Sequence, residues 1–69
     1  MPQSVECARF VACVRALDGL SGRTTDAVRF EPGGKCWGGD EGAKLCTDAC
    51  GRGLPRLVRD LTQVPEACR

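Results

Sequence analysis

Histidine and tyrosine are absent from this chain of 69 residues, and the only other aromatic side chains are two Phe and one Trp. Histidine is the commonest general base and the commonest metal ligand in proteins, so its absence removes the usual centre of acid–base catalysis and of metal binding. No nucleophilic side chain has a base beside it in the sequence. The sequence therefore predicts a protein that is not an enzyme, with no catalytic residue, no metal site and no cofactor.

Long apolar runs are also missing. No segment approaches the length of a membrane span, and none has the apolar core of a signal peptide. Ten basic and nine acidic residues are spread along the chain and leave a net charge of +1. Without a block of like charge we expect no nucleic-acid partner, and a membrane surface is a less favoured partner than a protein.

Cysteine, by contrast, is abundant, with six residues in a chain of 69. A domain of this size buries too little apolar surface to offset its conformational entropy, so natural examples carry disulfides or a metal. Each bridge adds up to about 4 kcal/mol by the chain-entropy estimate. Such bridges indicate an oxidising compartment, so we expect a secreted or periplasmic domain whose leader has been removed. The even number predicts that all six are paired: Cys7, Cys13, Cys36, Cys46, Cys50 and Cys68.

The first part of the chain predicts an amphipathic helix over residues 5–18. Ser4 stands at the N-cap position, and Gly19 is expected to end the helix. Cys7 and Cys13 fall on the same apolar arc but near opposite edges of it. They are badly placed to bond to each other, so both are expected to bond to cysteines in the second half of the chain.

Residues 20–40 show no strong periodicity and are interrupted by glycine-rich turns. So long an irregular stretch is unusual in a compact domain, and a disulfide through Cys36 would keep it ordered. A second helix is expected over residues 40–50, ending at Gly51, and a third from Pro55 onward. The third is expected to bury one apolar face, formed by Leu54, Leu57, Val58 and Leu61.

The fold class that follows is all-α. We expect a single small disulfide-rich domain over residues 1–69, with about three helices and a long irregular loop between helices one and two. Two disulfide patterns fit it. If the first two helices pack antiparallel, the pairs are Cys7–Cys50, Cys13–Cys46 and Cys36–Cys68. The competing set is Cys13–Cys36, Cys7–Cys46 and Cys50–Cys68, and the spacing does not decide between them.

Two surfaces are candidates for binding. Trp37 lies on a loop framed by glycines, next to Lys35. We favour inward packing of its ring over a disulfide, and the alternative is an exposed anchor for a protein partner. Arg52, Arg56 and Arg59 share one face of the predicted third helix, which is either a solvated face or a site for an acidic partner or an anionic headgroup.

Three cysteine-bearing segments together resemble uncharacterised cysteine-rich helical modules of secreted bacterial proteins and lipoproteins: Cys7-Ala8-Arg9-Phe10-Val11-Ala12-Cys13, Gly34-Lys35-Cys36-Trp37 and Cys46-Thr47-Asp48-Ala49-Cys50. This resemblance implies a location and a helical fold but no activity. The chain is also similar to saposin-like domains, which are helical and have six cysteines, although those domains open with a closer cysteine pair and have a more apolar interior.

We therefore expect a small secreted disulfide-rich binding or structural module, whose partner is a protein or the parent polypeptide. One alternative is a secreted membrane-active helical peptide of saposin-like or antimicrobial type, with Trp37 and the arginine face on anionic lipid. The other is a metal-binding protein with a cysteine cluster, which would have free thiols once its metal is removed.

Overall fold

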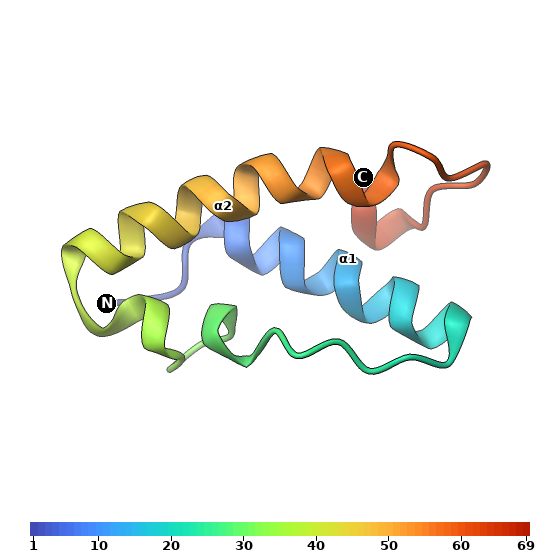
Figure 1. Cartoon of the computed structure of the whole chain (residues 1–69). Helices are drawn as coiled ribbons and strands as arrows, with labels where there is room; N and C mark the ends of the chain where they lie inside the picture. The colour runs from blue at the N-terminus through green and yellow to red at the C-terminus, as the bar shows by residue number, and fades with distance from the viewer.

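The computed structural model describes all 69 residues and confirms the all-α class, because it contains helices and no strand. No cysteine is free, so the predicted oxidation of all six is confirmed. Neither α-helix combines the length and the apolar character that a membrane-spanning helix needs. The elements, shown in Figure 1, are α1 (Val5–Ser21), η1 (Val28–Phe30), η2 (Lys35–Gly38), α2 (Asp40–Val58) and η3 (Glu66–Cys68), of which the three η elements are short 3₁₀ helices.

Helix α1 begins where the sequence predicts and ends later. The hydroxyl oxygen of Ser4 accepts a hydrogen bond of 3.2 Å from the backbone N–H of Cys7, which confirms the predicted N-cap. The expected end at Gly19 is wrong, because α1 continues to Ser21. Gly22 ends the helix instead: it takes the left-handed conformation, with a φ of +71°, and its N–H satisfies a carbonyl of the last turn.

Helix α2 is continuous where the sequence predicts two helices. Gly51 does not end it, and Pro55 lies inside it rather than at the start of a new helix. A proline has no N–H to donate to the carbonyl four residues earlier, which here belongs to Gly51. Gly51 is exposed, so water can satisfy that carbonyl. Disulfide bonding and packing against α1 on both sides of this point hold the helix together despite the two local stop signals.

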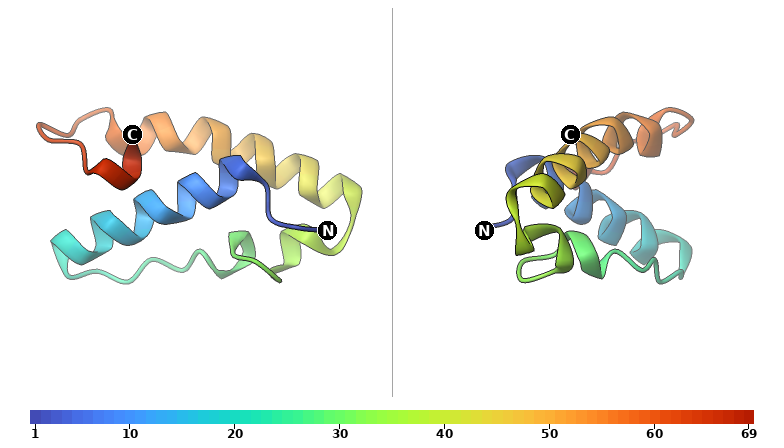
Figure 2. Two further views of the ribbon diagram at one scale, coloured as in Figure 1. Left: turned by 180° about the vertical axis from the view of Figure 1, so that it is seen from behind. Right: turned by 60° about the vertical axis from the view of Figure 1, so that its left-hand side comes forward.

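The two α-helices run in the same direction, so the antiparallel arrangement is wrong. Figures 1 and 2 show both helices directed toward the same end of the molecule. Cys7 bonds to Cys50, and three residues further along each helix the ring of Phe10 meets the backbone of Gly53. A β-carbon on Gly53 would lie 2.7 Å from that ring, so glycine permits this close approach.

Parallel neighbours require a connection that travels back along the first helix. Helix α1 has 17 residues and spans about 25 Å, at about 1.5 Å per residue. Residues 22–39, here called the return segment, cover that distance and include η1 and η2. Figure 1 shows this segment running back beneath α1, on the side opposite α2. The long irregular stretch in the sequence is therefore the consequence of the parallel helix pair.

Polar contacts attach the return segment to α1. The guanidinium of Arg15 donates to the carbonyl of Thr25 at 3.1 Å and to the carboxylate of Glu31 at 2.8 Å. The carboxylate of Asp18 accepts hydrogen bonds of 2.7 Å from both the backbone N–H and the hydroxyl of Thr25. The amide of Gln3 donates to the carbonyl of Phe30 at 2.9 Å. These contacts fix the segment along its length, where η1 and η2 are its only regular secondary structure.

The disulfides are Cys7–Cys50, Cys13–Cys68 and Cys36–Cys46. Cys7 and Cys13 both bond to the second half of the chain, as predicted. Of the first predicted pattern only Cys7–Cys50 is correct, and no pair of the competing pattern is. Because the helices are parallel, Cys46 lies one turn before Cys50, away from Cys13, and bonds to Cys36 on η2. The chain after α2 turns back, so that η3 brings Cys68 to Cys13.

The buried core lies at the end of the molecule where α2 begins. It consists of Cys7, Cys36, Trp37, Ala43 and Cys50, with Phe10, Phe30 and Cys46 packed against it. The Phe10 and Phe30 rings meet edge to face with their centroids 5.5 Å apart. At the other end of the helix pair, the apolar face Leu54, Leu57, Val58 and Leu61 is only half-buried, which corrects the expectation that it is fully covered.

Candidate functional site

Trp37 packs inward, as the sequence analysis favours. Its side chain is 3% exposed, and its indole N–H donates to the carbonyls of Glu31 at 3.0 Å and Phe30 at 3.3 Å. The neighbouring Cys36 forms its disulfide with the first half of α2. The ring therefore closes the core and offers no open surface to a partner.

The basic candidate residues lie on two separate surfaces. Lys35 is exposed on η2, just before α2 begins. Arg52 and Arg56 are exposed on the second half of α2, and Arg59 is exposed at its C-cap. Arg52 forms an ion pair with Asp48 one turn earlier, as the sequence spacing suggests. Arg56 and Arg59 have no acidic partner within ion-pair distance. A binding role for these arginines stays a prediction.

An apolar groove of 460 Å³ lies between the second half of α1 and the end of α2. Val14 is buried at its floor, and Leu20, which is 78% exposed, stands at its rim. Asp18, Arg23 and other polar side chains complete the rim, so both signs of charge are present. Thr25 of the return segment and Gln63 of the chain after α2 line the groove at its edges. Its apolar lining consists of Phe10, Val14, Leu17, Leu20, Leu57 and Leu61.

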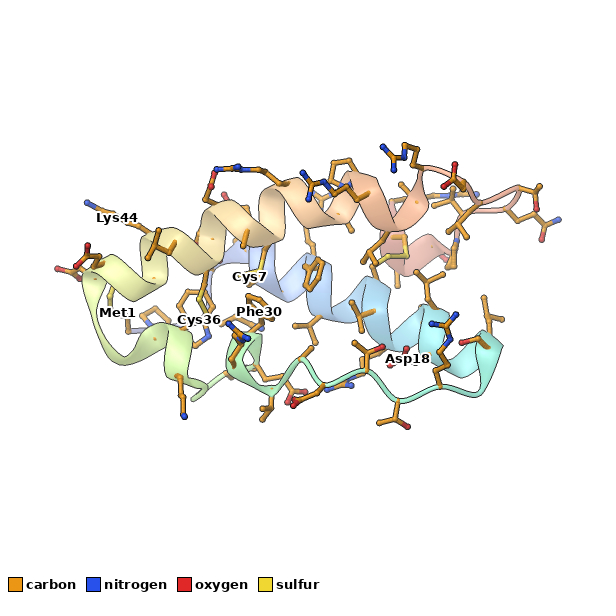
Figure 3. The ribbon with its side chains drawn as sticks, in the orientation of Figure 1. Met1, Cys7, Asp18, Phe30, Cys36 and Lys44 are labelled. Carbon is orange, nitrogen blue, oxygen red and sulfur yellow. A yellow bond between two sulfur atoms is a disulfide. The ribbon has the colours of Figure 1, made fainter.

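A second groove, of 710 Å³, lies at the opposite end beside the Cys36–Cys46 disulfide. Arg29 and Lys35 both line it, and no acidic side chain does. Figure 3 shows Cys36 beneath the first turns of α2 and close to Phe30. Gly34 shapes the wall: a β-carbon there would lie 2.4 Å from the carbonyl oxygen of Arg29, so only glycine fits without a shift.

Four of the nine carboxylates accept hydrogen bonds within the protein: Asp18, Asp26, Glu31 and Asp48. Figure 3 shows Asp18 on the side of α1 that faces the return segment. The hydrogen bonds from the backbone N–H and then the hydroxyl of Thr25 lower the pKa of Asp18 from its ordinary value of 3.8. Asp18 therefore stays ionised to a lower pH than a free carboxyl group, which maintains its contact with Thr25. The hydrogen bond to Glu31 raises the pKa of Arg15, whose charge is permanent in any case.

No group of three or more Asp, Glu or Cys side chains lies together in a way that could hold a metal ion. Sequence reasoning identified Lys35 but not Arg29, and it expected the leucines of the apolar groove to be covered. Comparisons with protein-family models, with curated proteins and with solved structures gave no match to this chain. The resemblance to secreted bacterial modules therefore stays a prediction, and the two grooves are the features from which a function can be argued.

Proposed function

We propose that this protein is a secreted, non-catalytic binding module that holds an apolar segment of a partner protein in the groove between α1 and α2. The observation that carries the proposal is the groove itself, in which six apolar side chains surround a hollow of 460 Å³. That volume falls in the range of about 300–1,000 Å³ found for binding pockets. The three disulfides support the secreted location, because such bonds persist in oxidising compartments.

The distribution of exposed apolar residues favours a protein segment over a lipid surface. Membrane-active helices gather their apolar residues on one face. Here Val5 is in the first turn of α1, Leu20 is in its last turn, and Leu45 is on α2. Only Leu20 belongs to the groove. A groove rim with both Asp18 and Arg23 also suits the mixed polar groups of a peptide better than a uniformly anionic membrane.

The contacts of the acidic groups support the absence of catalysis. Asp18 is bound by Thr25, Glu31 by Arg15 and Asp48 by Arg52. With no histidine in the chain, no base remains to activate a hydroxyl in the groove.

The proposal is tested by selecting peptides that bind the native protein from a displayed random library. Their binding to the native protein is then compared with their binding to two matched leucine variants. Leu20→Gln alters the rim of the groove, and Leu45→Gln makes the same change elsewhere, at a side chain that is 68% exposed. We expect selected peptides to be rich in Leu, Ile and Phe. Loss of one apolar contact should weaken their binding about tenfold in Leu20→Gln and leave it unchanged in Leu45→Gln.

Two results would contradict the proposal. Equal binding to both variants would place the peptides outside the groove. Release of dye from anionic vesicles by the native protein would support the membrane-active alternative instead. Because both substituted leucines are exposed, neither variant is expected to change the fold, and circular dichroism checks this.

A further inference from the structure

We propose that the Cys36–Cys46 disulfide is a site of thiol–disulfide exchange that selects anionic thiols. The six cysteines differ in accessibility: five are between 0% and 6% exposed, and only Cys46 is not buried. Cys46 also lines the open groove of 710 Å³, together with its partner. An attacking thiolate can therefore reach one sulfur of this disulfide, while the sulfurs of Cys7–Cys50 and Cys13–Cys68 are covered by protein.

The charge of the groove determines which thiols it favours. Arg29 and Lys35 line it, no acidic side chain does, and neither base takes part in an ion pair. The guanidinium of Arg29 lies 5.6 Å from the centre of the Phe30 ring, which keeps that charge near the groove wall. Two unpaired cations at the mouth of a groove raise the local concentration of an anionic reagent and lower that of a cationic one.

The exchange is a balanced two-step reaction. A thiolate RS⁻ attacks Sγ of Cys46, a bond forms between these sulfurs, and the Sγ–Sγ bond breaks, releasing Cys36 as a thiolate. A second RS⁻ attacks the R-group sulfur of the mixed disulfide and releases Cys46 as a thiolate. The two cysteine thiolates take up protons from solvent. One protein disulfide is thus reduced while two RSH molecules are oxidised to RSSR, so the reductant is the anionic thiol itself.

Opening this bond leaves the helix pair intact. Cys36–Cys46 closes a loop of sequence separation 10, and its loss removes the cross-link between η2 and the body of α2. Cys7–Cys50 and Cys13–Cys68 still join α1 to α2 and to the end of the chain. Trp37 is adjacent to Cys36 and buried, so its fluorescence is expected to report the opening without global unfolding.

The test compares 2-mercaptoethanesulfonate, an anionic thiol, with cysteamine, a cationic one, on the native protein at low ionic strength. Each rate is divided by the rate of the same thiol with bis(2-hydroxyethyl) disulfide, which removes differences in intrinsic nucleophilicity. Reactions are quenched by alkylation and the labelled cysteines are mapped by mass spectrometry. We expect Cys36 and Cys46 to be labelled first, and the normalised rate to be about tenfold higher for the sulfonate.

The double variant Arg29→Gln/Lys35→Gln should bring the ratio of the two normalised rates, sulfonate thiol over cysteamine, close to one. The control Arg56→Gln/Arg59→Gln removes the same charge from exposed, unpaired arginines elsewhere and should leave the ratio unchanged. Earlier labelling of Cys13 and Cys68, or of Cys7 and Cys50, would overturn the assignment of the site. A ratio that is the same in the native protein and in Arg29→Gln/Lys35→Gln would overturn its selectivity for anionic thiols.

Discussion

The two ends of the helix pair are built differently. At the end where α2 begins, two disulfides and Trp37 form a buried core under the first turns of α2. At the end where both helices finish, one disulfide to η3 holds the structure, and the leucines between the helices stay half-buried around an open groove. We refer to these as the closed end and the open end.

The difference shows how a short chain can be cross-linked and packed at one end and leave apolar side chains uncovered at the other. By the chain-entropy estimate the disulfides with sequence separations of 43 and 55 contribute about 4 kcal/mol each and the one with separation 10 about 3 kcal/mol. Because these bridges and the closed end supply most of the stability, the open end can leave its leucines uncovered. An unfilled apolar groove is compatible with a stable fold only where other contacts supply the stability.

Replacement of one large side chain at each end gives the strongest test of the difference in stability between the closed end and the open end. Trp37→Ala should lower the free energy of unfolding by about 3–5 kcal/mol, since it removes a buried aromatic ring. Leu61→Ala, in the half-buried lining of the groove, should lower it by only about 1 kcal/mol. Denaturant unfolding of the oxidised proteins measures both, and similar losses would show that the two ends do not differ as described.

Two glycines of α2 sharpen the comparison between the ends, because one touches α1 and the other does not. Gly53→Ala would place a β-carbon 2.7 Å from the Phe10 ring, and Phe10 is itself held against Phe30. We expect a net loss of about 1–2 kcal/mol from overpacking. Gly51→Ala meets no atom within 4 Å and should instead stabilise the helix by up to about 1 kcal/mol. Thermal unfolding with opposite shifts in Tm is the expected readout.

The smallest expected effect is that of pH on the contact between Asp18 and the return segment. The pKa of Asp18 is lowered in the folded protein, so its contribution to stability is present above the ordinary value of 3.8 and is lost as the pH falls through the lower folded value. The amide proton of Thr25 should titrate in that acidic range by NMR, whereas the Trp37 indole proton should not. In Asp18→Asn the Thr25 titration should vanish, and its persistence would mean that another carboxyl group is responsible.

The sequence predicted those features of the fold that depend on adjacent residues or on the number of cysteines. The Ser4 cap, the pairing of all six cysteines and the inward position of Trp37 belong to this class. The direction of α2 does not, because it depends on contacts between residues far apart in the sequence, such as the Cys7–Cys50 disulfide and the approach of Gly53 to Phe10. An antiparallel pair would place Cys46 beside Cys13, whereas in the parallel pair Cys13 bonds to Cys68.

The grooves were less accessible to sequence reasoning than the fold. An amphipathic pattern shows that Leu57 and Leu61 share an apolar face, but it does not show whether another element covers that face. Arg29 and Lys35 line the same groove because the turn through Gly33 brings the two flanking segments together. In this turn the Gly34 N–H donates to the Glu31 carbonyl at 2.8 Å, and Gly33 has a φ of +79°. The Pro32-Gly33 pair was the one local signal that could have suggested this proximity.

The parallel arrangement also has a consequence for biosynthesis. A chain that emerges from its N-terminus exposes Cys13 long before its partner, which follows 55 positions later. Until Cys46 emerges, only Cys7, Cys13 and Cys36 of the six cysteines are available, and no native disulfide connects any two of them. Cys36–Cys46 is the first native bond that the order of emergence allows. Any bridge formed earlier has to be broken by exchange before the native set can form, and disulfide exchange is much slower than helix formation.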